Sequence, residues 1–123
     1  MYTPLTIANT MIMLNWKSRP AQNPIWLNKM VHIVHGWSLA FNRSVVSELP
    51  ELWQFGPIYV SLYDALRKFK RETVSNMQPL PRGRSCPVVP DTDIETLRLI
   101  EKVLERYGHL DHNQLCSYCH SSN

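Results

Sequence analysis

The chain has 123 residues, of which 44% are hydrophobic and 19% are charged, and its net charge is +3. This length fits one domain with one core, and the balance of apolar and charged residues excludes a disordered chain. The sequence has no apolar run long enough to span a membrane and no basic start typical of a signal peptide. Because three cysteines do not make a disulfide framework, we expect a reducing, cytoplasmic environment.

The first part of the chain predicts two helices, each with a proline at its start. Thr3-Pro4 and Asn23-Pro24 both place a capping side chain before a proline at the first helical position. Apolar residues then recur at helical spacing, and the first helix should end before Arg19-Pro20. The second helix, of about four turns, is apolar over most of its circumference, which predicts a position in the middle of a bundle.

The middle of the chain predicts a mixture of extended and helical pieces. Residues 42–47 indicate a brief extended piece, and residues 48–55 a helical turn whose two leucines and tryptophan face inwards. Gly56 can take a positive φ, and Pro57 is suited to open the next helix. That helix carries an apolar stripe and should run to about Lys70.

Prolines dominate the segment that follows. Their density over residues 72–90 excludes a helix and predicts a long loop, with a short strand at residues 88–89. Thr92 and Glu95 then have the spacing of a capping box, which predicts the start of another helix. Apolar residues continue at helical spacing until Gly108, a natural stop.

Together these elements predict a mainly α fold: a compact single-domain bundle of about five to six helices, with one long Pro-rich loop and a short β piece. Asp111-x-x-Gln114 repeats the capping-box pattern and predicts a last short helix. The expected core comprises residues 4–70 and 91–120, and the loop covers residues 72–90.

The cysteines and histidines near the C-terminus are the main candidates for metal chemistry. Residues 116–120 fit the pattern of c-type haem attachment, but no export signal precedes them. Zinc bound by His112, Cys116, Cys119 and His120 stays open as an alternative. Since small thiols at helical spacing are the simpler interpretation, we expect no cofactor.

Motifs of catalysis are absent from the sequence. It contains no phosphate-binding glycine loop, no Gly-x-Ser-x-Gly elbow and no His-Glu-x-x-His, so we expect a protein that is not an enzyme. The basic cluster of Arg67, Lys68, Lys70 and Arg71 fits a solvated helix end better than a nucleic-acid site. Lys29 is different, because a cation within an apolar helix needs a carboxylate, a carbonyl or a ligand as partner.

Three segments, taken in chain order, resemble the Panacea family of GepA- and SocA-like proteins. The segments are Leu27–Met30 with His35–Trp37, Trp53–Tyr59 with Leu62-Tyr63, and Glu105–Gly108 with Leu115–His120. They are similar to the family's lysine helix with its His-Gly-Trp end, its Trp-x-x-Gly-Pro segment and its closing Tyr-Gly block. The set spans about residues 5–120.

The resemblance implies a protein-binding domain of phages, prophages and toxin–antitoxin operons. We therefore expect an antitoxin-like protein that neutralises a partner by direct binding. A phage-encoded inhibitor of a host defence complex, such as an anti-CRISPR protein, and a small zinc- or nucleic-acid-binding regulator are the alternatives. Trp53, Gly56 and Pro57 match motifs that we expect to be structural. The expected partner-binding residues are Lys29, His35, Trp26, Trp37, Tyr59, Tyr63, Arg67 and His120.

Overall fold

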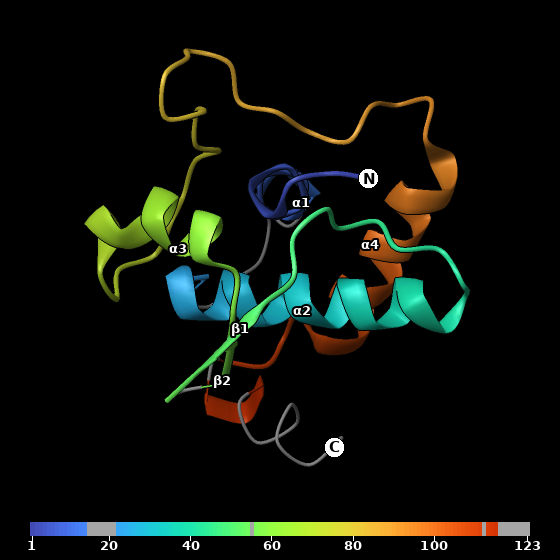
Figure 1. Ribbon diagram of the computed structural model, residues 1–123, viewed down its shortest axis with the longest axis horizontal. Coiled ribbons are helices and arrows are strands. Elements are labelled where there is room, and N and C mark those ends of the chain that lie inside the picture. Colours follow the sequence, from blue (N-terminus) through green and yellow to red (C-terminus); the bar gives the residue numbers. More distant parts are fainter. Residues whose placement is uncertain (15–21, 55, 112, 116–123) are drawn as a thin grey trace.

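The computed structural model describes residues 1–14, 22–54, 56–111 and 113–115, and it confirms a mainly α fold (Figure 1). The described residues form four α-helices and one 3-10 helix; one α-helix is central, and a small two-stranded sheet lies beside it. In chain order the elements are α1 (Pro4–Leu14), α2 (Pro24–Ala40), β1 (Glu51–Trp53), β2 (Gly56–Ile58), α3 (Val60–Leu66), the 3-10 helix η1 (Arg67–Phe69) and α4 (Ile94–Tyr107).

Both predicted helix starts near the N-terminus are confirmed. The Thr3 hydroxyl accepts from the backbone N–H of Thr6 at 3.2 Å, and the Asn23 side chain accepts from that of Trp26 at 2.9 Å. Each cap occupies an N–H group that would otherwise lack a helical acceptor. The predicted end of the first helix at Arg19-Pro20 lies outside the described residues.

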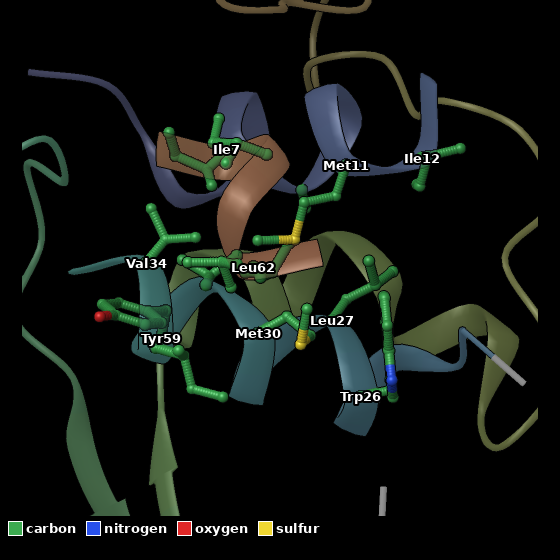
Figure 2. Packing of buried hydrophobic residues seen from close by; sticks show 14 of the residues in the cluster. Ile7, Met11, Ile12, Trp26, Leu27, Met30, Val34, Tyr59 and Leu62 are labelled. Atoms are coloured by element: carbon green, nitrogen blue, oxygen red, sulfur yellow. The ribbon is translucent and has the colours of Figure 1, made fainter. Parts of the chain in front are cut away.

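Helix α2 lies at the centre of the fold, as its apolar circumference predicted. It contacts α1, α3, α4 and β2. Figure 2 shows Ile7 and Met11 of α1 and Leu62 of α3 gathered around Met30 and Val34 of α2, and all five side chains are fully buried. Burial of this apolar surface is the main source of stability for such a bundle.

The predicted helical turn at residues 48–55 is wrong for the described residues 48–54, because Glu51–Trp53 form one strand of a β-hairpin. β1 and β2 pair antiparallel, with Trp53 opposite Gly56. Gly56 does take a positive φ, of 111°, but it serves a tight chain reversal rather than a helix entry. Pro57 accordingly lies within β2, and α3 begins at Val60.

The loop at residues 72–90 has no strand at Val88-Val89, yet it is held firmly against α1. Asn9 donates to the carbonyls of Gln78 and Pro87 at 2.9 and 3.0 Å, and its side-chain oxygen accepts from the Gln78 N–H at 2.8 Å. Thr10 accepts from the Val89 N–H at 2.9 Å. These buried groups take the place of a ladder of strand hydrogen bonds.

The predicted capping box at Thr92 and Glu95 is also wrong by one position. Asp93 caps α4 instead, accepting from the N–H of Thr96 at 3.2 Å, and Tyr2 donates a hydrogen bond to the same carboxylate. The second predicted box is confirmed: Asp111 and Gln114 exchange two hydrogen bonds of 2.9 Å.

Candidate functional site

Four of the expected partner-binding side chains lie inside the fold. Trp26, Lys29, His35 and Tyr59 are between 0 and 5% exposed. The Trp26 indole donates to the carbonyl of Leu110 at 2.8 Å, which ties the start of α2 to the segment after α4. In this conformation these side chains support a surface rather than form one.

The buried His35 takes part in a chain of hydrogen bonds between β2 and the segment after α2. The Ser44 hydroxyl donates to the Val46 carbonyl at 3.0 Å, and its oxygen lies 3.3 Å from His35 Nε2. Nε2 therefore carries the proton and donates to Ser44, while Nδ1 accepts from the Tyr59 hydroxyl at 2.7 Å. Burial lowers the pKa of His35, in agreement with a neutral ring.

A second hydrogen bond fixes the same tyrosine from its backbone. The side-chain oxygen of Asn28 on α2 accepts from the N–H of Tyr59 at 2.8 Å, and both residues are fully buried. Asn28 and Ser44 were not among the residues expected from the sequence, since polar side chains carry no local sign of a distant partner. Together with His35 they fix the end of β2 against α2.

Apolar side chains of β1 and of the residues close to it in the fold are exposed. We call Leu49, Leu52, Trp53 and Tyr63 the hairpin patch. Leu49 and Leu52 are 81 and 84% exposed, and Trp53 is 38% exposed. The rings of Trp53 and Tyr63 meet edge to face, with centroids 4.9 Å apart. The expectation that Trp53 is a packed core residue is therefore wrong.

The remaining expected residues are scattered. Trp37 is half-buried, meets Tyr107 edge to face at 6.0 Å, and lines a cavity beside α4. Arg67 is exposed on η1. His120 lies outside the described residues, as does the alternative zinc site at His112, Cys116, Cys119 and His120. Within the described ranges, no group of three or more His, Cys, Asp or Glu side chains is placed to hold a metal ion.

A second histidine of α2 lies next to the Tyr59 ring. His32 is half-buried, its centroid lies 6.5 Å from that of Tyr59, and its Nδ1 is buried without a hydrogen-bond partner in the described structure. Burial, followed by the charges of His35 and Lys29, lowers the pKa of His32. Burial also raises the pKa of the Tyr59 hydroxyl, with a smaller contribution from Glu48. All three rings are therefore held neutral near pH 7.

Comparison with known proteins places this arrangement in a family. The model of the family described as "Antitoxin SocA-like, Panacea domain" matches residues 27–123. No curated protein and no solved structure matches significantly. In the part of the chain that the structure describes, no helix has the length and apolarity needed to cross a bilayer. The match covers most of the chain, from α2 through the hairpin and α4, and the chain therefore belongs to the SocA-like Panacea family of antitoxin-like domains.

Proposed function

We propose that this protein neutralises a protein partner by direct binding and that the hairpin patch is the contact surface. The observation that supports the proposal is the exposure of Leu49, Leu52 and Trp53 at a hairpin that is fixed to α2 through Tyr59. Exposed apolar surface of this kind is a feature of protein–protein interaction sites. Tryptophan and tyrosine, both present here, are over-represented among residues that dominate binding energy.

The buried hydrogen bonds give this surface a defined shape. His35 and Asn28 both bind Tyr59, so the hairpin is held at the end of β2 before any partner arrives. A surface ordered in advance loses less conformational entropy on binding. The family motifs at His35 and Tyr59 thus serve partner binding from behind the surface, by positioning the hairpin.

The partner would be a toxin, as the family description implies, or a component of a host defence complex. A photo-crosslinking amino acid at position 52 of the tagged chain would identify it, with the same amino acid at Ser75 as control. The captured protein is then expressed alone and together with the chain. We expect it to arrest growth alone and to be neutralised when both are present.

Matched variants test whether the hairpin patch causes the neutralisation. Leu52→Asp places a charge in the patch, whereas Ile94→Asp places the same charge on another exposed apolar residue, which is 57% exposed. We expect Leu52→Asp to abolish neutralisation and Ile94→Asp to retain it, at equal protein levels. Full neutralisation by Leu52→Asp would reject the hairpin patch, and a captured protein without effect on growth would reject the antitoxin-like role.

A further inference from the structure

A cavity of about 370 Å³ lies between the end of α2 and the first turns of α4, and it shares no residue with the hairpin patch. Figure 1 shows α4 crossing α2 near the end of α2, where the two helices are in contact. The volume falls within the range of roughly 300–1,000 Å³ that is typical of ligand-binding pockets. Neither the family description nor the hairpin patch accounts for it.

Apolar side chains form the floor of this cavity. Trp37 of α2, Val45 and Leu99 are buried or half-buried and form this floor, and Phe41 follows Trp37 by about one turn. Phe41 also lines the cavity and is 74% exposed, so a large apolar ring of the lining is in contact with water. An apolar side chain entering the cavity would remove this surface from water, which is favourable.

Positive charge predominates among the charged residues that line the cavity. Arg43, Arg98 and Lys102 line the cavity together with a single carboxylate, that of Glu95. Arg43 forms an ion pair with Glu95 and lies 3.6 Å from Asp93. Arg98 and Lys102 are exposed, share one face of α4 and form no ion pair among the described residues. Two cations therefore remain to attract negative charge.

We infer that this cavity binds an acidic peptide segment of a partner protein, whose central aliphatic or aromatic side chain enters the apolar floor. Carboxylates beside that side chain would then meet Arg98 and Lys102. The apolar floor and the small number of unpaired cations fit a protein segment better than a nucleic acid, whose binding depends mainly on many phosphate contacts. The inference rests on the proposed protein-binding function and adds a second contact, remote from the hairpin patch.

The test is a titration of the full chain, observed by nuclear magnetic resonance, with three short synthetic peptides. One has a Leu-Phe centre flanked by Asp and Glu, the second has the same centre flanked by Lys, and the third has an Ala-Ala centre flanked by Asp and Glu. We expect the first alone to bind, shifting the Trp37 indole resonance and the amide of Leu99. Raising the salt concentration should weaken the binding, because exposed charges are screened.

Variants assign the binding to this cavity. Arg98→Glu with Lys102→Glu should lower the affinity for the acidic peptide by about tenfold, since opposite charges become like charges. Phe41→Ser should lower the same affinity by about fivefold through loss of apolar contact. The charge-matched control, Arg82→Glu with Arg84→Glu, changes exposed loop residues and should leave the affinity unchanged.

Three outcomes would overturn the inference: equal binding of the Lys-flanked peptide, unchanged affinity in the Arg98 and Lys102 variant, or shifts confined to the hairpin. Tighter binding of a single-stranded oligonucleotide through Arg98 and Lys102 would overturn it in favour of nucleic acid. These measurements do not involve neutralisation. If peptide binding is absent while Leu52→Asp still abolishes neutralisation, this inference fails and the proposed function stands.

Discussion

The Pro-rich loop and the β-hairpin of this protein differ in two ways: the irregular loop is bound into the fold, whereas the regular hairpin is exposed. The loop at residues 72–90 has no helix or strand, yet Asn9, Thr10 and Gln22 bind its backbone groups inside the fold. The hairpin is regular, yet β1 is exposed along its whole length. Irregular backbone can therefore belong to the packed core, while a regular element supplies the surface that remains available for a partner.

The strongest way to break this comparison is to remove the amide that holds the loop. Asn9→Leu should lower the free energy of unfolding by about 3 kcal/mol, because it leaves two buried carbonyls and one N–H group without partners. Urea unfolding followed by circular dichroism measures the change. Asn76→Ala removes an amide from an exposed residue of the same loop and should change the stability by less than about 0.5 kcal/mol. Equal effects of the two variants would show that the loop is not held by Asn9.

The attachment of the hairpin should depend on one hydroxyl. Tyr59→Phe removes the donor to His35 Nδ1 and should lower the free energy of unfolding by about 1–2 kcal/mol, since a buried acceptor loses its partner. Tyr63→Phe is the matched control, because its hydroxyl forms no hydrogen bond in the described structure. A Tyr59→Phe protein as stable as the Tyr63→Phe protein would contradict the chain of hydrogen bonds through His35.

Acidification should weaken the same attachment. The pKa values of His32 and His35 are lowered below 6.5 in the fold, so the unfolded chain binds protons first as the pH falls. Stability is therefore fully present above pH 6.5 and is lost progressively below it. Unfolding measured across this range should show a shallower loss for His32→Gln than for the exposed-site control His109→Gln. The same slope in both variants would exclude His32 as a contributor.

The smallest effect on stability is expected on the hairpin patch itself. Leu52→Ser replaces a side chain that is 84% exposed and should change the free energy of unfolding by less than about 0.5 kcal/mol. Thermal unfolding measures this change. A loss of more than 1 kcal/mol, well above that estimate, would mean that Leu52 packs within the fold and that the patch is not a free surface.

The parts of this fold that could be predicted are those determined by neighbours in sequence. The Asn23 cap and the Asp111–Gln114 box join residues three positions apart, so their spacing carries the information. The hydrogen bonds that hold the Pro-rich loop join Asn9 to Gln78, and no local sequence pattern indicates that pair. Asn9 interrupts the apolar residues of α1, yet it is among the most deeply buried polar residues.

The candidate site shows the same limit. Gly56 takes the positive φ that glycine permits, but whether it leads into a helix or reverses a hairpin depends on where the chain goes next. Here Ile58 and Tyr59 are buried, and the side chain of Asn28 on α2 accepts a hydrogen bond from the Tyr59 N–H. The inward face assigned to Leu49 and Leu52 was wrong because a helical period was assumed, whereas Leu49 lies outside any helix or strand and Leu52 lies in β1.

Helix α1 has a consequence for how this protein can be divided. The family match begins at residue 27, whereas α1 ends at Leu14 and supplies Ile7, Ala8 and Met11, all with no exposed surface. A fragment trimmed to the matched residues would uncover one side of α2 and release the loop that Asn9 holds. The extent of sequence similarity and the extent of the cooperative folding unit are therefore different boundaries. Fusions, deletions and domain transplants of this chain should keep α1, because the segment with the family motifs packs against this helix, which lies outside the matched residues.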